Sequence, residues 1–415
     1  MTESCATVPL GSITTWLSGG TPDRSRDGYW GGPIPWISAA TLKAFAVEKS
    51  DQGITLDAVR AGGPIAPVGS TLILVRGMSV HREVRAGVVI QPVAFNQDVK
   101  ALVPTRSLNP RFLTYSLLAR SSQILRLVTS AGSGTGVLET GPLKRLRIWL
   151  PTLLEQARLV KILDHVEGHV AALERLIAKK EAVRQGMIQR LLTGETHLPG
   201  FADSWRDVVL GKVVAYVKTV PLSRAQLNRT SRLRYLHYGD IHTSRASVLN
   251  AAHADMPRAP DALATTAGRL QVGDLVLVDA SEDAAGVAKS LEITSVPCDG
   301  IVPGLHTIAA RFDKAVLADG FKAYLQFIPA FRAALLRLAA GTKVLATTRS
   351  HLSSVSLMLP NVDEQRAIAL VLRDCDTELD ALHTYLAKVR AIKRGMMQEL
   401  LTGRTRLPVM EAAAA

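Results

Sequence analysis

The chain has 415 residues, of which 47% are hydrophobic and 20% charged, and its formal net charge is +13. This length predicts two to four domains, and the composition excludes an intrinsically disordered protein. No apolar run of about 18 residues occurs and the N-terminal segment lacks a basic stretch followed by an apolar one, so we expect a cytoplasmic protein that does not contact a membrane.

The positive charge is concentrated in two blocks of the sequence. Lys and Arg outnumber Asp and Glu within residues 1–150 and 201–359, but nearly balance them within 151–200 and 360–415. A basic excess of this kind favours a polyanionic partner such as nucleic acid.

The first block, residues 1–150, contains short segments rich in Val, Ile and Leu, separated by Gly, Pro and Asn. Segments such as STLILV and AGVVIQPVAF predict strands, and a helix is expected near Arg111–Leu127, which indicates a mixed α/β domain. RGMSVHREVR places Arg and His side chains between two strands, where they can contact phosphates or base edges. The candidate nucleic-acid contacts of this block are Arg76, Ser79, His81, Arg82, Arg85, Asn96, Gln97, Lys100, Ser133 and Thr135.

Residues 151–199 are predicted to form a long helix. Apolar residues recur at alternating steps of four and three, and this 3.5-residue period is typical of a coiled-coil seam. A Glu-Gln pair falls in the first turn, where negative charge suits the helix dipole, and Gly194 is expected to be a left-handed C-cap residue. The predicted seam residues are Leu159, Leu163, Val166, Val170, Leu173 and Ile177.

The second block, residues 200–359, has the same character as the first. DLVLVDA, SLEITSV and GLHTIAARF predict strands, and a helix is expected near Ala323–Leu338. SRAQLNRTSRLRYLHYGD clusters four Arg side chains before a His and a Tyr; a single Arg is usually a solvated surface charge, so the clustering carries the argument. The candidate contacts of this block are Arg224, Arg229, Arg232, Arg234, His237, Tyr238, Lys289, Thr342 and Lys343.

Residues 360–408 repeat residues 151–199 at a constant offset of 209, with about 20 identities in 50 positions. Each helix would run about 38 residues and therefore roughly 57 Å, and each is the simplest partner for the other. Gly403 repeats the expected C-cap. Lys180, Arg184 and Lys393 interrupt the seams, where we expect the helices to separate or to meet a partner. The second seam comprises Ile368, Leu372, Leu379, Leu382, Leu386 and Val389.

No catalytic constellation stands out in the sequence. GSGTG resembles a phosphate loop without the following Lys, NPRF lacks a glycine-rich methyl-donor loop, and Asp98 with Lys100 lacks the second carboxylate of a nuclease site. The three cysteines are far apart, which predicts buried thiols and neither disulfides nor a zinc site. We interpret the chain as a binding protein without catalytic residues or a metal site.

The repeat, the near-neutral helices and several motifs together resemble the specificity subunit of type I restriction-modification systems. The motifs are GGTPDRSRDGYWGGPIPWISAATLK, AFNQDVKAL, YLHYGDIHT, VGDLVLVDASED, GLHTIAARF, the two Leu-Pro-(x)3-Glu-Gln helix starts and the two LLTG helix ends. The resemblance covers nearly the whole chain.

This resemblance implies an α/β (α+β) fold with an internal pseudo-twofold repeat. Two target-recognition domains, 1–150 and 200–359, would each read half of a bipartite double-stranded DNA site, and antiparallel spacer helices, 151–199 and 360–408, would hold them apart; 409–415 would be a tail. The chain would bind no cofactor. Two modification methyltransferase subunits would use S-adenosylmethionine to methylate adenine, and restriction subunits would use ATP and Mg.

Two alternatives remain at this stage. An enzyme that both recognises and modifies or cuts DNA would need a methyl-donor loop or a complete nuclease site, which we do not find. A coiled-coil scaffold could instead use its basic blocks to bind acidic proteins, and salt-dependent binding to duplex DNA would distinguish the two binding proteins.

Overall fold

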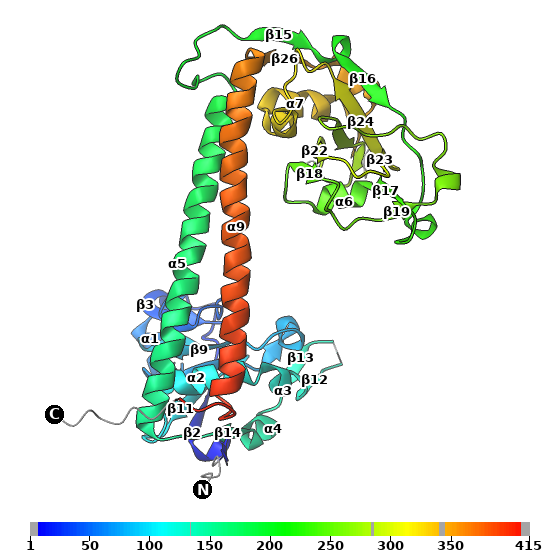
Figure 1. The fold of residues 1–415 in the computed structure, drawn as a ribbon. Helices are drawn as coiled ribbons and strands as arrows, with labels where there is room; N and C mark the ends of the chain where they lie inside the picture. Colours follow the sequence, from blue (N-terminus) through cyan, green and yellow to red (C-terminus); the bar gives the residue numbers. More distant parts are fainter. Residues whose placement is uncertain (1–6, 133, 284–285, 340–344, 408–415) are drawn as a thin grey trace, which may run out of the picture. The chain divides into compact units, whose positions relative to one another are not determined.

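A computed structural model describes residues 7–132, 134–283, 286–339 and 345–407, and the chain forms two compact units (Figure 1). Unit 1 comprises Met1–Glu174 and Thr384–Ala415, and unit 2 comprises Arg175–His383. The two long helices, α5 (Leu153–Leu191) and α9 (Val362–Leu400), each contribute one part to each unit. The predicted division into two blocks, two helices and a tail remains a prediction.

Unit 1 is built on a mixed five-stranded sheet of order β2-β11-β7-β9-β4, in which only the β4–β9 pair is parallel. Smaller sheets have the orders β5-β3-β10-β6, β12-β13-β8 and β1-β14. The strands are β1 (Thr7–Pro9), β2 (Thr14–Ser18), β3 (Trp30–Ile37), β4 (Ala46–Val47), β5 (Gly53–Ile54), β6 (Ile65–Ala66), β7 (Thr71–Leu74), β8 (Arg76–Gly77), β9 (Ala86–Val89), β10 (Val93–Phe95), β11 (Val99–Pro104), β12 (Val128–Ser130), β13 (Gly136–Leu138) and β14 (Arg147–Trp149). The helices are η1 (Leu10–Ser12), η2 (Asp27–Tyr29), α1 (Leu56–Arg60), η3 (Met78–His81), α2 (Pro110–Ala119), α3 (Ser121–Leu125) and α4 (Thr140–Arg145).

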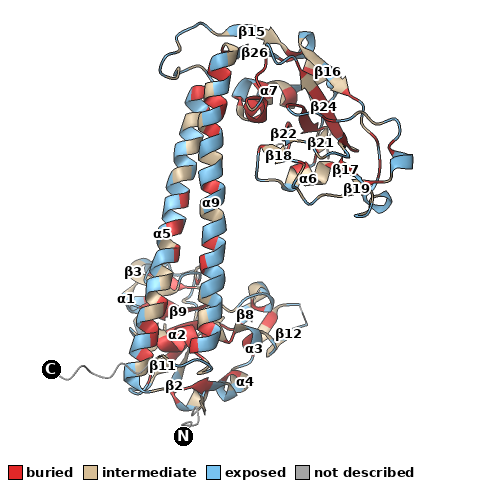
Figure 2. Ribbon diagram, viewed as in Figure 1, coloured by how far each residue is buried: buried red, intermediate tan, exposed pale blue. Residues whose placement is uncertain are grey.

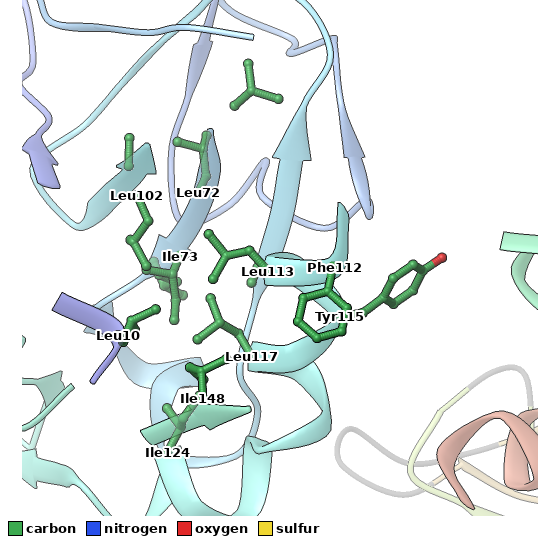
Figure 3. Close-up of a cluster of buried hydrophobic side chains, with 14 of the residues drawn as sticks. Leu10, Leu72, Ile73, Leu102, Phe112, Leu113, Tyr115, Leu117, Ile124 and Ile148 are labelled. Atoms are coloured by element: carbon green, nitrogen blue, oxygen red, sulfur yellow. The ribbon is translucent and has the colours of Figure 1, made fainter. Parts of the chain in front are cut away.

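The core of unit 1 lies where α2 packs against β7 and β9. The Asn109 side chain caps α2 by accepting hydrogen bonds from the next turn, and Pro110 occupies the first turn, where its missing N–H costs nothing. Figure 3 shows apolar side chains of α2 facing those of β7 and β11; each fully buried Leu or Phe contributes roughly 1.5–3 kcal/mol. The helix predicted near Arg111–Leu127 is present, but Arg120 leaves helical geometry and divides it.

Unit 2 repeats this plan with a five-stranded sheet of order β16-β24-β20-β22-β18. The smaller sheets are β19-β17-β23, β21-β25 and β15-β26. The strands are β15 (Arg206–Val209), β16 (Val214–Val217), β17 (Leu233–Leu236), β18 (Val248–Asn250), β19 (Arg258–Ala259), β20 (Leu275–Val278), β21 (Ala280–Ser281), β22 (Ser290–Ser295), β23 (Ile301–Pro303), β24 (Thr307–Phe312), β25 (Leu345–Ala346) and β26 (Ser356–Leu359). The helices are η4 (Leu210–Lys212), η5 (Arg224–Gln226), α6 (Tyr238–Thr243), η6 (Asp261–Leu263), η7 (Lys322–Phe327), α7 (Pro329–Leu338) and α8 (Arg349–Ser354).

The two units correspond element by element beyond the long helices. The run β1-η1-β2 has its counterpart in β15-η4-β16, and Leu10 and Leu210 are fully buried at the same place in each. Gly69 and Gly273 precede β7 and β20 with φ of 85° and 90°, a left-handed geometry that favours glycine. The two blocks therefore share one repeated fold, and the predicted fold class is confirmed.

The long helices follow the predicted repeat in length and in seam. Each has 39 residues, and Leu153 and Val362 begin them 209 positions apart. Every predicted seam residue is buried except Val166 and Leu382, which are half-buried (Figure 2). Gly194 lies in the turn directly after α5 and has the predicted left-handed geometry with a φ of 76°, and the second C-cap glycine, Gly403, has a φ of 75°.

Contacts between α5 and α9 run in opposite residue order within each unit, which shows antiparallel packing. In unit 1, Glu174 pairs with Arg390 at 2.6 Å and His169 Nε2 lies 3.0 Å from the Tyr385 hydroxyl. In unit 2, Glu181 Oε1 lies 3.3 Å from the Nε2 atom of His383, within ion-pair range.

The polar interruptions of the seam are filled by ion pairs between the two helices. Lys180 Nζ lies 2.8 Å from Glu378, Arg184 pairs with Asp376, and Lys393 also pairs with a carboxylate of the other helix. The expected separation of the helices at these positions is therefore wrong, because each cation has a partner that the seam pattern did not show.

The Gln of each Leu-Pro-(x)3-Glu-Gln motif joins the start of a long helix to the domain before it. Gln156 is fully buried; its Oε1 accepts from Asn109 N at 2.7 Å, and its Nε2 donates to Ser107 O and Pro151 O. The motif is thus explained by three buried hydrogen bonds rather than by the helix dipole alone.

The second copy of the motif makes the same contacts in unit 2. Gln365 Oε1 accepts from Ala318 N at 2.9 Å, and its Nε2 donates to Val316 O and Pro360 O, both at 2.9 Å. The repetition of all three bonds shows that the motif specifies how a helix begins against its domain.

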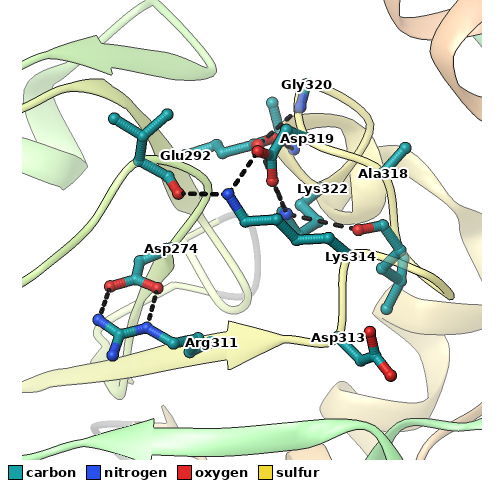
Figure 4. A network of polar contacts seen from close by, with 12 residues as sticks. Asp274, Glu292, Arg311, Asp313, Lys314, Ala318, Asp319, Gly320 and Lys322 are labelled. Carbon is teal, nitrogen blue, oxygen red and sulfur yellow. Dashed lines mark hydrogen bonds and ion pairs between the residues drawn. The ribbon is translucent and has the colours of Figure 1, made fainter.

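Unit 2 contains a buried charge network that includes Lys322 (Figure 4). Lys322 Nζ donates to Asp319 Oδ1 at 2.6 Å and lies 3.8 Å from Glu292, which also accepts from Gly320 N and Ala323 N. Burial raises the pKa of Glu292 to about 7 despite these partners. Because every charge has a partner, the network links β22 to η7 without an isolated buried ion.

The expectation of three buried thiols is wrong for both cysteines that the structure describes. Cys298 is exposed and Cys375 is half-buried, both as free thiols, while Cys5 lies outside the described residues. Cys298 lies in the turn between β22 and β23.

Candidate nucleic-acid interface

In unit 1, the fold brings the basic segment RGMSVHREVR beside the loop GSGTG. β8 pairs with β13 so that Arg76 lies opposite Val137, and the His81 Nε2 atom is 3.2 Å from Gly134 O. Arg76, His81 and Arg82 are exposed. Gly132 and Gly134 lie between β12 and β13, which pair as a hairpin, so these glycines lie in a turn beside cationic side chains.

The Asn96–Asp98 turn belongs to the same region, because Asp98 O accepts from Arg76 N at 3.3 Å. Asn96 is buried and its Nδ2 donates to Asp98 Oδ2 at 3.0 Å, so its amide is committed to the turn. Gln97 is exposed and accepts from the Thr21 hydroxyl at 2.8 Å. Of the two predicted adenine-reading amides, only Gln97 is accessible.

A neighbouring loop carries cations that the sequence analysis did not single out. The Arg24 guanidinium lies 4.9 Å from the Trp30 ring and 5.6 Å from the Trp36 ring, and Arg26 lies 5.4 Å from the Tyr29 ring. Both arginines are exposed. In the sequence, Tyr29 and Trp30 follow the basic segment DRSR closely, and this combination could have indicated the loop as a candidate contact.

Two other predicted cations of unit 1 have partners within the chain. Arg85 donates to Glu83 at 2.7 Å and to Ala39 O at 3.0 Å, and its side chain is mostly buried. Lys100 Nζ donates to the Ser18 hydroxyl at 2.8 Å. Using either cation to contact a ligand would therefore require breaking an internal hydrogen bond.

Three predicted contacts, Ser133, Thr342 and Lys343, lie outside the described residues. Ser79 and Thr135 are half-buried within the basic region of unit 1.

In unit 2, three of the predicted arginines are exposed on the segment that leads into β17. Arg224 pairs with Asp240 at 2.9 Å, and Arg229 pairs with Asp255 at 3.1 Å. Arg232 is also exposed. These exposed pairs are weak in water, so the cations can exchange their partners for phosphates.

Two other predicted contacts of unit 2 support local structure. Arg234 Nη1 donates to Ala254 O at 2.8 Å and to Ala251 O, which anchors the turn after β18. His237 is buried, caps α6 by accepting from Gly239 N at 3.0 Å, and has a pKa lowered chiefly by burial. Its imidazole is therefore held neutral as a hydrogen-bond acceptor.

The remaining predicted residues of unit 2 lie beside a cavity of 480 Å³. Tyr238 lines the cavity together with His242, and Lys289 Nζ donates to His242 O. The β21–β25 pair, which borders this cavity, is the counterpart of the β8–β13 pair of unit 1.

Within the described residues, no group of three or more His, Cys, Asp or Glu side chains is arranged to hold a metal ion. Among the helices that the structure describes, none is long and apolar enough to cross a membrane.

Residues 3–182 match a family model described as the type I restriction modification DNA specificity domain. The chain is 29% identical over 178 residues to the EcoR124I/EcoR124II specificity subunit of Escherichia coli, a match that covers 42% of this chain and 44% of that protein. It is 21% identical over 332 residues to the MjaVIII specificity subunit of Methanocaldococcus jannaschii, covering 74% of this chain and 73% of that protein.

Two solved structures share the fold. The S subunit of a type I restriction-modification system from M. genitalium has a TM-score of 0.60 at 12% identity, covering 98% of this chain and 96% of that one. A chain from a structure described as the basis of complex assembly and conformational transition of the type I R-M system has a TM-score of 0.56 at 17% identity, covering 96% and 98%.

The chain therefore has the fold of type I S subunits. The predicted resemblance to the specificity subunits of type I restriction-modification systems is confirmed by the domain match over residues 3–182 and by the similar specificity subunits.

Proposed function

We propose that the chain is the DNA-recognising specificity subunit of a type I restriction-modification complex in the cytoplasm, and that each unit reads one half of a bipartite double-stranded site. The observation that carries this proposal is one scaffold present twice with different surface chemistry. Arg76 of β8 has Ala280 of β21 as its counterpart, by their equivalent pairing with β13 and β25. A repeated scaffold with different side chains is suited to reading two different half-sites.

The accessible cations are proposed as the contacts to DNA. In unit 1 these are Arg76 and Arg82, and in unit 2 Arg229 and Arg232, since all four are exposed. Asn96, Arg234 and His237, whose polar groups are occupied within the chain, are proposed to position the loops instead.

The length of the long helices is proposed to set the spacer between the half-sites. A 39-residue helix is roughly 58 Å long at 1.5 Å per residue. Removing one heptad from each helix keeps the seam in phase and is expected to shorten the spacer while both half-site sequences stay the same.

An exposed stripe on each long helix is proposed to dock a modification methyltransferase subunit, one copy per stripe. On α5 the stripe includes Leu176, Val183 and Gly186; residues 209 positions later, Tyr385 and Ile392 are likewise exposed on α9. Exposed apolar residues recurring every seven positions are unusual on a solvated helix.

The glycines of these stripes support the docking proposal. Gly186 and Gly395 lie inside helices, where glycine costs roughly 1 kcal/mol relative to alanine, yet a Cβ at either would meet nothing within 4 Å. Crowding within the chain therefore does not require them, whereas close approach of a partner backbone would. Lys179 and Lys388, exposed in the same stripes, favour an acidic rim on that partner.

The chain is proposed to catalyse no reaction itself. The methyltransferase subunits would use S-adenosylmethionine, and restriction subunits would use ATP and Mg. The alternative of a coiled-coil scaffold for acidic proteins predicts no preference for a two-part DNA sequence.

The test is to co-express the chain with its methyltransferase and map methylated adenines across the genome. One two-part motif is expected. Scattered or absent methylation, or duplex binding that does not weaken with salt, would contradict the proposal. Replacing Ile392 by Asp should reduce co-purification of the methyltransferase while the variant still binds the same duplex.

A further inference from the structure

The cavity beside β21 in unit 2 has walls of aromatic rings and carboxylates. The His306 and Tyr238 rings are nearly perpendicular with centroids 5.5 Å apart, and the centroid of the His242 ring lies 6.1 Å from that of the same tyrosine. Glu282 and Asp283 complete the described lining together with Ala280 and Ser281 of β21. At 480 Å³ the cavity has room for the edge of a nucleobase.

His306 occupies this wall at a conformational cost. Its φ is +56°, a left-handed geometry that a glycine adopts without strain and other residues rarely do. Its side chain is half exposed, and Nδ1 lies 3.3 Å from Asp279 Oδ1, which favours a fixed orientation of the ring. A strained residue whose ring is held toward an open cavity is typical of a site where that ring contacts a ligand.

The carboxylates distinguish this site from its counterpart in unit 1. After β8 the chain continues with Met78 and Ser79, and after β21 with Glu282 and Asp283. Asp283 Oδ1 accepts from Gly286 N at 2.6 Å and holds the loop. Glu282 is exposed and makes no hydrogen bond or ion pair with any other residue that the structure describes.

A carboxylate near DNA is repelled by phosphates, so its place in a reading surface requires a hydrogen-bond donor to compensate. The donors that bases present in the major groove are the exocyclic amino groups of cytosine and adenine, whereas guanine and thymine present acceptors at the corresponding positions. A side chain that can only accept hydrogen bonds therefore selects cytosine or adenine and rejects guanine and thymine.

We infer that this cavity is a base-reading site of unit 2 that takes the edge of a cytosine or adenine, with Glu282 accepting from its exocyclic amine and the His306 and Tyr238 rings forming the wall. This inference rests on the proposed function, since it assigns one base position within the half-site that unit 2 reads.

The experiment compares two variants with the wild-type chain, each co-expressed with the methyltransferase, by mapping methylated adenines. Glu282→Gln keeps the shape but can also donate, so at one position of one half-site the preference for amino over keto bases should fall about 10-fold or more. His306→Gly relieves the backbone and removes the ring, so it should fold at least as well while losing the same preference. His253→Ala, at an exposed histidine of unit 2 away from the cavity lining, is the control and should leave the motif unchanged.

An unchanged motif in both cavity variants would overturn the inference, as would a loss of preference at both half-sites or a loss of all methylation by a folded variant. A wild-type chain that directs methylation to no two-part motif would instead refute the proposed function. The two failures are therefore distinguishable.

Discussion

Replacement of the buried glutamine at the start of α9 tests how the long helix is joined to unit 2. Gln365 makes three hydrogen bonds of 2.9 Å, with Ala318 N, Val316 O and Pro360 O, and is 1% exposed. At about 1 kcal/mol for each bond, Gln365→Ala should cost about 3 kcal/mol of local stability. Since about 1.4 kcal/mol corresponds to a factor of ten, hydrogen exchange of the Ala318 amide should accelerate roughly 100-fold.

Hydrogen exchange measured on peptides of both units provides the assay and its internal reference. The Asn109 amide, which donates to Gln156 in unit 1, should exchange at the wild-type rate in Gln365→Ala and accelerate in Gln156→Ala. Gln398→Ala, at an exposed position of α9, should change neither amide. If Gln365→Ala leaves the Ala318 amide protected, the buried amide is not what joins helix to domain, and the reasoning fails.

Three further predictions concern stability. Because the pKa of Glu292 is raised from 4.5 to about 7 in the folded chain, the stability that its protonated carboxyl contributes is fully present below about pH 4.5 and is lost as pH rises through about 7. In urea unfolding, the free energy of unfolding should therefore fall less between pH 5 and pH 8 for Glu292→Gln than for the wild-type chain, and an equal fall would contradict this. Leu163→Ala should lower the free energy of unfolding by about 3 kcal/mol because the side chain is fully buried, whereas Leu154→Ala should lower it by less than about 0.5 kcal/mol because Leu154 is 65% exposed. Equal denaturation midpoints for the two variants would contradict the assignment of Leu163 to a buried seam. Gly194→Ala should destabilise by about 1 kcal/mol because its φ is 76°, while Gly186→Ala should stabilise by up to about 1 kcal/mol, and thermal shifts of the same sign would count against both explanations.

The periodic features of this protein could be predicted because they are local. Both helices keep the predicted seam, and residues such as Leu163 and Leu372 are fully buried. The strands expected at STLILV, SLEITSV and GLHTIAARF are β7, β22 and β24. In each case neighbouring positions in the sequence carry the pattern, and the backbone geometry of a helix or strand turns it directly into one buried face.

The fate of individual polar residues could not be predicted, because their partners lie far away in the sequence. Lys393 interrupts a seam pattern, and only the fold shows that Glu167 completes the pair. Asn96 has the side chain of an adenine reader, but tertiary packing buries it. Gln365, assigned only to a helix start by its position, proves to be bonded to the turn before η7.

The sequence by itself determined that the chain contains an internal repeat, that each copy ends in a helix with a coiled-coil seam, and that two basic blocks accompany those helices. The tertiary structure decided which charges remain available to a ligand, where the basic segment of unit 1 meets the glycine-rich loop, and that unit 2 opens a cavity where unit 1 presents Arg76. The physical reason is that burial periodicity is fixed by backbone geometry over a few residues, whereas a hydrogen bond or a cavity wall depends on segments that only the folded chain brings together.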